Sequence, residues 1–238
     1  MQNLNIDDSE ILNNKQNEDL NTAINIYINN YSHNDLINFL KTGSVVEKQA
    51  AVLKLENINS DNDAEVIINN LTGCDGKIRE AVSFKLKEFI FQKPEYFEKY
   101  SDIFLDAIVD INGNICRNTL CALKSLKTNY KFCNEFCSKL LSKTLELAIK
   151  AKDFDIQDGK YKINKQIFKL YWYLEAIFEF IEFIEPESLN RILLSAKNVQ
   201  DYTIREKTAK ILSKINSPIF ENIKLELKND KNYYVRRF

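Results

Sequence analysis

The sequence predicts an all-α fold built from repeated two-helix units, and three observations lead to this prediction. The chain has only 5 Gly and 3 Pro in 238 residues, whereas sandwiches and barrels need turn residues at intervals of about ten. Apolar residues recur at helical spacing in several segments. Asp or Asn, which cap helix starts, precedes most of these segments at the same distance.

Composition narrows the class of protein further. Charged residues make up 28% and hydrophobic residues 45% of the chain, and 33 Lys and Arg against 34 Asp and Glu leave a net charge of −1. This balance is typical of a globular protein with a real core. It offers no overall attraction to nucleic acid, which we therefore do not expect as a partner.

The sequence also predicts a cytoplasmic protein that does not enter a membrane. Its 5 Cys are an odd number, and the first residues lack a basic segment followed by an apolar one. The most apolar stretch, 167–184, is interrupted by Lys169 and three Glu. A disulfide framework and a transmembrane helix are therefore not expected.

The first thirty residues differ from the rest of the chain. They contain five acidic residues, and Lys15 is their only cation. We expect residues 1–30 to be an acidic leader that is partly disordered or marginally helical. The repeat domain is expected to cover residues 31–238.

Four segments carry apolar-rich stripes with offsets of 0, 4, 8 and 11 residues. Such offsets return to one face of a helix. The four stripes are Ile78, Val82, Leu86 and Phe89; Ile115, Thr119, Leu123 and Leu126; Ile163, Ile167, Tyr171 and Leu174; and Ile204, Thr208, Leu212 and Ile215.

Helix caps and arginines recur in register with these stripes. Three residues before a stripe, or before Val235, stand Asp75, Asn112, Asp201 and Asn232, and Lys160 takes this place in the third stripe. One residue after the stripe begins stand Arg79, Arg205 and Arg236, with Cys116 in the second stripe. A first copy begins with Ser44 as its cap.

The predicted caps lie 31 to 48 residues apart, which is the period of two-helix repeats. A polar loop inserted near 152–162 explains the longest distance between two successive caps. The expected first helices of the units are 35–41, 63–71, 100–111, 132–150, 188–196 and 218–228.

With these caps, stripes and arginines, residues 35–238 resemble the HEAT-repeat family. The resemblance implies a right-handed α-solenoid of about five to six two-helix repeats. It also implies that the cap Asp and the following Arg make hydrogen bonds along the stack. HEAT-like proteins include scaffolds, adaptors, phycobilin lyases and DNA-base glycosylases, so the family alone does not define an activity.

Eight residues are candidates for binding a partner, although each also has a structural interpretation. The arginines could form a basic ladder on the concave face or could hold the stack together. The aromatic residues of 167–184 could reach a groove or fill the core. The three Glu, at i, i+4 and i+7, could recognise a basic partner or be solvated. The candidates are Arg79, Arg205, Arg236, Trp172, Tyr173, Glu175, Glu179 and Glu182.

The C-terminal end is basic and aromatic. Residues 202–238 contain nine Lys and Arg against four Asp and Glu. This surplus, opposite in sign to the leader, makes the C-terminal end a candidate for self-association or for binding an acidic partner.

The residues needed for most catalytic sites are scarce. His33 is the only histidine and is expected in a turn. Cys133 and Cys137 lie one helical turn apart without a Cys-x-x-Cys pair, and the Asp residues of 153–158 lack a calcium loop's spacing. We therefore expect no catalytic residues, no metal and no cofactor.

The leading functional hypothesis is a non-enzymatic scaffold that binds another protein through its concave groove or C-terminal end. The alternative, implied by the family, is a phycobilin-lyase subunit or a chaperone of a chromophore protein. A more remote alternative is a DNA-base glycosylase, for which Glu175 beside Trp172 is the only available pairing.

Overall fold

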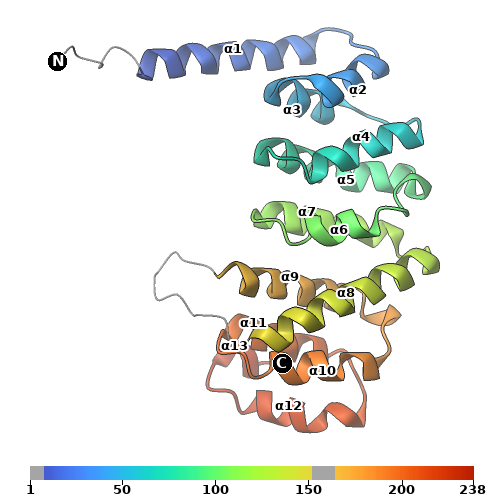
Figure 1. Cartoon of the computed structure of the whole chain (residues 1–238), viewed down its shortest axis with the longest axis vertical. Helices are drawn as coiled ribbons and strands as arrows, with labels where there is room; N and C mark the ends of the chain where they lie inside the picture. The colour runs from blue at the N-terminus through green and yellow to red at the C-terminus, as the bar shows by residue number, and fades with distance from the viewer. Residues whose placement is uncertain (1–7, 152–163) are drawn as a thin grey trace, which may run out of the picture. The chain divides into compact units, whose positions relative to one another are not determined.

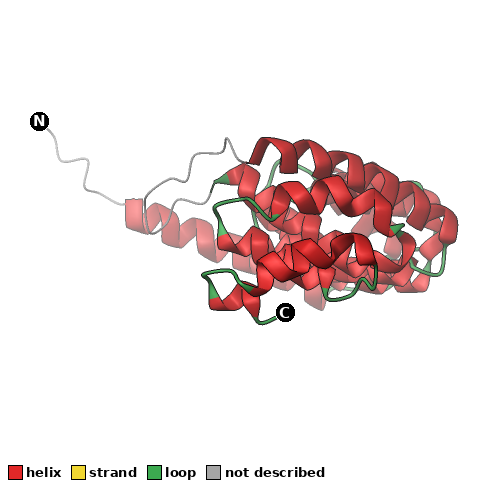
Figure 2. Cartoon of the chain, turned by 90° about the horizontal axis from the view of Figure 1, so that it is seen from below, coloured by secondary structure: helices red, strands yellow, loops and turns green. Residues whose placement is uncertain are grey.

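The computed structural model describes residues 8–151 and 164–238, with side chains from residue 14 onward, and this part of the chain is helical with no strand (Figure 2). The all-α prediction is therefore confirmed. The chain divides into two compact units, Met1–Tyr96 and Phe97–Phe238. None of the described helices is long and apolar enough to cross a membrane.

The described residues of the N-terminal unit, 8–96, form five α-helices and a short 3-10 helix. They are α1 (Asp8–Ile28), α2 (His33–Thr42), α3 (Val45–Lys54), α4 (Asp61–Leu71), α5 (Gly76–Gln92) and η1 (Pro94–Tyr96). Helix α1, which lies in the expected leader, packs on α3 through its last turns (Figure 1). Helix α3 in turn packs on α5.

In the C-terminal unit, residues 97–151 and 164–238 form four pairs of α-helices. The first helices of the pairs are α6 (Ser101–Ala107), α8 (Tyr130–Lys150), α10 (Pro186–Ala196) and α12 (Glu221–Lys228). The second helices are α7 (Gly113–Leu123), α9 (Lys165–Glu179), α11 (Tyr202–Leu212) and α13 (Tyr233–Arg236). Short 3-10 helices lie at Lys124–Leu126 (η2), Ile181–Phe183 (η4) and Pro218–Phe220 (η5).

Within each unit, helices of the same kind contact one another. First helix packs on first helix where α6 contacts α8 and α8 contacts α10, and second helix packs on second where α9 contacts α11 and α11 contacts α13. In the N-terminal unit α2 contacts α4 and α3 contacts α5. Each unit thus has two layers of helices with an apolar core between them.

The predicted helix caps are confirmed at five positions. Asp75, Asn112, Asp201 and Asn232 are N-caps, and the side chain of each accepts a hydrogen bond from a backbone N–H two residues ahead. Ser44 caps α3 and forms a reciprocal capping box with Glu47.

Every residue of the stripes beginning at Ile78, Ile115 and Ile204 is buried, with an exposed fraction of at most 8%. Their residues lie on the buried side of the second helices, except that Leu126 and Ile215 come just after the helix ends. In the first copy, which begins at the cap Ser44, Ala51, Leu55 and Ile58 are buried as well.

The predicted start of the third stripe is wrong. The N-cap of α9 is Asn164, whose side chain accepts hydrogen bonds from the N–H groups of Gln166 and Ile167. Lys160 and Ile163 lie outside the described residues. Ile167 therefore holds the first stripe position. Glu175 then occupies a position that is apolar in the second helices α5, α7 and α11.

With Asn164 as the cap of α9, the distances between successive caps are equal just before and just after the longest one. The caps Asn112 and Asn164 are 52 residues apart, and Asn164 and Asp201 are 37 apart, the same distance that separates Asp75 from Asn112. The inserted loop predicted near 152–162 lies outside the described residues.

Candidate functional site

A hollow of about 370 Å³ lies between α7 and α9 in the C-terminal unit. Arg117, Leu120, Cys121 and Lys124 line it from α7 and η2. Helical spacing brings Arg117, Cys121 and Lys124 to one face, because they stand at i, i+4 and i+7. From α9 the hollow is lined by Tyr171, Trp172, Glu175 and Glu179.

Glu175 is the most buried charge of this hollow. Its Oε2 lies 2.6 Å from Lys207 Nζ and its Oε1 lies 2.9 Å from Lys210 Nζ, both on the neighbouring helix α11. Burial opposes ionisation of Glu175, but the hydrogen bonds from the two lysines lower its pKa below the usual value. Burial by itself lowers the pKa of Lys207. The hydrogen bond and the charge of Glu175 outweigh this effect, so the pKa of this lysine is raised. The pair is therefore charged.

The other two glutamates of the predicted acidic strip are also paired with lysines. Glu179 Oε2 lies 2.8 Å from Lys124 Nζ, and Glu182 Oε1 lies 2.7 Å from Lys127 Nζ. Each carboxylate thus has a cation within the C-terminal unit. The strip of like charge seen in the sequence is neutralised in the fold.

The two aromatic candidates are largely buried. Trp172 is 8% exposed and has edge contacts to Phe168 and Tyr171. Its indole Nε1 is buried without a hydrogen-bond partner in the described part of the chain. Tyr173 is buried as well, which raises its pKa to about 12. Of these two residues, only Trp172 lines the hollow.

The three candidate arginines share one arrangement, in which Nη1 donates to the backbone carbonyls five and six residues earlier. Arg79 binds the carbonyls of Gly73 and Cys74. Arg205 binds those of Val199 and Gln200. Arg236 binds those of Asp230 and Lys231. Each arginine thereby fastens the turn that precedes its own helix.

Arg205 also connects two neighbouring helix pairs of the C-terminal unit. Its Nε lies 2.7 Å from Asp230 Oδ2 and its Nη2 lies 3.2 Å from Asp230 Oδ1, and both side chains are about nine-tenths buried. Asp230 in turn accepts a hydrogen bond from the N–H of Asn232, the cap of α13. This bidentate pair is a bond along the stack, made with the next turn and not with the cap Asp201.

Cys116 takes the place of the arginine in α7. Its Sγ lies 3.0 Å from the carbonyl oxygen of Asp110, which is also six residues earlier. Burial raises the pKa of this thiol to about 12, so it stays protonated and can donate. The substitution keeps the contact with the preceding turn.

Sequence reasoning missed the cations of this site and an exposed aromatic pair elsewhere. Arg117, Lys124, Lys207 and Lys210 were not singled out, although the correct register of α9 would have placed Glu175 next to the core. In the N-terminal unit, Phe84 and Phe91 of α5 are 65% and 77% exposed. Their i, i+7 spacing was the available signal.

The remaining candidates for chemistry have structural contacts. His33 begins helix α2, with its Nε2 2.8 Å from Asp63 Oδ2, and is not the turn residue that the sequence suggested. Cys133 and Cys137 are buried, which raises their pKa values to about 11 and 12. Among residues with described side chains, no three His, Cys, Asp or Glu converge as metal ligands.

Comparison with known proteins adds no family or relative. No protein-family model matches the chain, and no curated protein matches its sequence significantly.

Proposed function

We propose that the chain is a HEAT-like right-handed α-solenoid and a non-enzymatic scaffold that binds a protein partner on its second helices. The repeated helix start supports the architecture: a cap, an apolar residue three positions later and an arginine that folds back on the preceding turn. The two layers of like helices within each unit support it as well.

The hollow between α7 and α9 carries the functional proposal. It combines Tyr171 and Trp172 with side chains of both charges. Aromatic residues and arginine dominate binding energy in protein interfaces. Arg117 is exposed and forms no ion pair with any described residue, so its guanidinium is available for a carboxylate of the partner.

The test is an affinity purification of the tagged protein from its own cells, followed by mass spectrometry and an absorbance scan. We expect a stoichiometric protein partner that Arg117→Glu loses. The matched control is Lys131→Glu, the same change of charge at an exposed position of α8, which should retain the partner.

Three results would contradict the proposal. The first is a partner that Arg117→Glu retains as well as the parent does. The second is no stoichiometric protein at all. The third is a coloured eluate, which would favour the lyase-type alternative.

A further inference from the structure

Three buried side-chain atoms have no hydrogen-bond partner among the described residues, and all three belong to α7 or α9. They are Thr119 Oγ1, Trp172 Nε1 and Glu175 Oε2. The Glu175 oxygen lies 2.6 Å from Lys207 Nζ, and Thr119 does not line the hollow between the two helices. Trp172 does line it, is 8% exposed, and can only donate through its indole N–H. This donor is therefore the group that lacks an acceptor.

Gly113 leaves room beside the indole of Trp172. A Cβ at Gly113 would lie 3.8 Å from Cζ2 of Trp172, the ring atom next to the carbon that bears Nε1. The glycine thus keeps a space of methyl size against this edge of the ring. Gly113 is also the first residue of α7, and the first turn of a helix carries a partial positive charge. An acceptor with a negative charge suits this position.

Arg117 stands one turn after Gly113, on the same face of α7. It lines the hollow, is exposed, and forms no ion pair with a described residue. Four cations at the hollow face two carboxylates. The cations are Arg117, Lys124, Lys207 and Lys210, and the carboxylates are those of Glu175 and Glu179. The excess of positive charge attracts an anionic group.

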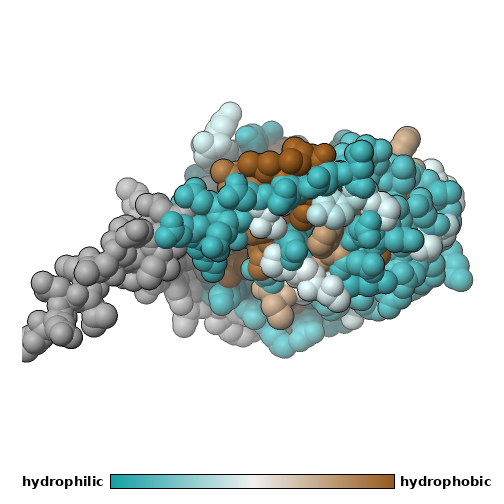
Figure 3. All heavy atoms as spheres, turned by 90° about the horizontal axis from the view of Figure 1, so that it is seen from above, coloured by the Kyte–Doolittle hydropathy of each residue, from teal (hydrophilic) through white to brown (hydrophobic). Residues whose placement is uncertain are grey.

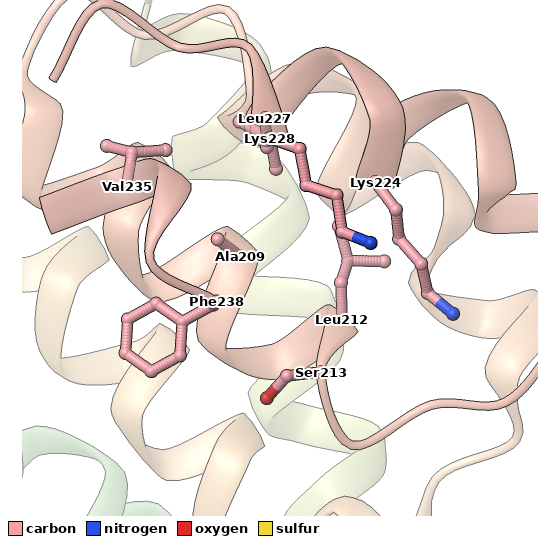
Figure 4. Close-up of a pocket in the computed structure, with 8 residues that line it drawn as sticks. All are labelled: Ala209, Leu212, Ser213, Lys224, Leu227, Lys228, Val235 and Phe238. Atoms are coloured by element: carbon pink, nitrogen blue, oxygen red, sulfur yellow. The ribbon is translucent and has the colours of Figure 1, made fainter. Parts of the chain in front are cut away.

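Two other surfaces of the chain lack such a donor. Seen from the α1 end, hydrophobic residues gather in a band beside hydrophilic ones (Figure 3). The C-terminal pocket, of about 210 Å³, lies between α11, α12 and α13 (Figure 4). Its apolar lining is already buried apart from Phe238. No buried side-chain atom described in α1 or in this pocket is unpaired, so the hollow between α7 and α9 is where an acceptor is missing.

We propose that this hollow binds a carboxylate of the partner, which accepts hydrogen bonds from the Arg117 guanidinium and from the Trp172 indole N–H. The inference rests on the proposed scaffold function and names the chemical group that enters its site. A carboxylate matches the planar fork of arginine. Its two oxygens also have acceptor sites to spare for the indole. An Asp or Glu side chain and the C-terminal end of a chain both carry this group.

The test uses the indole itself. Trp172 is the only tryptophan of the chain, so nitrogen-15-labelled protein gives a single indole N–H resonance. Three probes are titrated: the α-N-methylamide of N-acetylglutamate, with a side-chain carboxylate; N-acetylalanine, with a chain-end carboxylate; and the α-N-methylamide of N-acetylglutamine, which is neutral. We expect the carboxylate probes to move the resonance downfield in a saturable way, because a hydrogen bond deshields the proton. The one that saturates at the lower concentration identifies the source of the carboxylate.

Two pairs of variants locate the contact. Arg117→Gln should raise the dissociation constant of the probe about tenfold or more, since it removes a charge-assisted hydrogen bond. Its control Lys131→Gln, at an exposed position of α8, should bind like the parent. Gly113→Ala fills the space beside the indole and should also weaken binding. Gly76→Ala, at the first position of α5, is its control. Circular dichroism checks that every variant is as helical as the parent.

Two outcomes would overturn the inference. The first is an indole resonance that neither carboxylate probe moves at up to about 50 mM, well above a millimolar dissociation constant. The second is an equal shift with the neutral probe. Binding that Arg117→Gln and Gly113→Ala both retain in full would likewise reject the site.

Failure of this inference is distinct from failure of the scaffold function. A partner that Arg117→Glu loses, together with an indole that does not respond, would refute the carboxylate contact and leave the scaffold function in place. A saturable indole response without any copurified partner would do the reverse.

Discussion

At the scale of single residues, the most consequential feature is the charge of Glu175, whose side chain is only 17% exposed. It stands at a stripe position that other second helices fill with Leu86, Leu123 or Leu212. A charge there is tolerated because Lys207 and Lys210 reach it from α11. Lys207 also lies 4.5 Å from the centre of the Tyr171 ring, which adds a cation–π contact.

Replacing Glu175 by Gln should destabilise the protein strongly. Lys207 would remain buried without its carboxylate, and loss of one partner of a buried pair costs about 3–5 kcal/mol. Denaturant unfolding measures this cost. Glu179→Gln is the control, because its partner Lys124 is about half exposed and such pairs are worth less than about 1 kcal/mol. Equal effects of the two changes would contradict the role given to Glu175.

The double variant Glu175→Leu with Lys207→Met should recover most of the lost stability. It removes both charges and keeps apolar volume, which is often neutral relative to a buried pair. Its free energy of unfolding should lie well above that of Glu175→Gln. If the double variant is no more stable than Glu175→Gln, the loss of stability arises from packing and not from the unpaired charge of Lys207.

Acid should weaken the fold through the same residue and through Asp63. Burial opposes ionisation of Asp63, but hydrogen bonds from His33, the N–H of Asn59 and Ser60 lower its pKa. A lowered folded pKa stabilises the fold above the unfolded pKa, and this stabilisation is lost as the pH falls through the folded value. The unfolded values lie near 3.8 for Asp63 and 4.5 for Glu175.

Unfolding measured from pH 7 down to pH 2 should therefore show a fall in stability that begins near pH 4.5. The fall should be shallower in Asp63→Asn, which has no proton to gain at this position. A pH dependence unchanged in that variant would show that Asp63 has the same pKa in the folded and unfolded chain.

At the scale of elements, the start of α9 decides the register of the central repeat. An Asn cap at position 164 shifts the helix by one turn from the position expected for a cap at 160. Ile167 then lies at the first buried position, and Phe168 takes the place that Arg79, Cys116 and Arg205 hold elsewhere. The shift places Glu175 opposite the lysines of α11.

Asn164→Ala should lower the stability by about 1 kcal/mol, since it removes the side-chain acceptor of the N–H groups of Gln166 and Ile167. Asn164→Asp is the matched control and should keep the stability, because Asp caps as well as Asn. Thermal unfolding compares the two. A loss in the Asp variant as large as in the Ala variant would show that capping is not the reason.

At the scale of the whole molecule, the five thiols differ in how far the fold shields them from solvent. Cys74 is exposed and Cys121 is partly exposed, whereas Cys116, Cys133 and Cys137 are buried. Burial also raises the pKa values of these three thiols to between about 11 and 12. Because the thiolate is the reactive form, both effects suppress their reaction.

A thiol reagent should therefore label Cys74 quickly, Cys121 more slowly, and the three buried cysteines only after unfolding. Mass spectrometry of the labelled protein counts the modified residues with time. Denaturant should expose all five. Rapid labelling of Cys133 or Cys137 in the native protein would show that the C-terminal unit opens readily.

Local sequence determined the helices, their caps and their buried faces. The five confirmed caps and the three buried stripes follow from short-range rules, because a cap bonds two or three residues ahead and a stripe repeats every turn. The stripe alignment failed at α9, where it put Lys160 in the cap position although Asn164 supplies the cap.

Only the tertiary structure decided which charges meet. Glu175 and Lys210 are 35 residues apart, and Arg205 and Asp230 are 25 apart. Each pair joins two different helix pairs of the C-terminal unit. No local periodicity specifies such partners, because they depend on how one helix lies on the next. The hollow between α7 and α9 and the C-terminal pocket arise from the same packing, which is why neither could be recognised in the sequence.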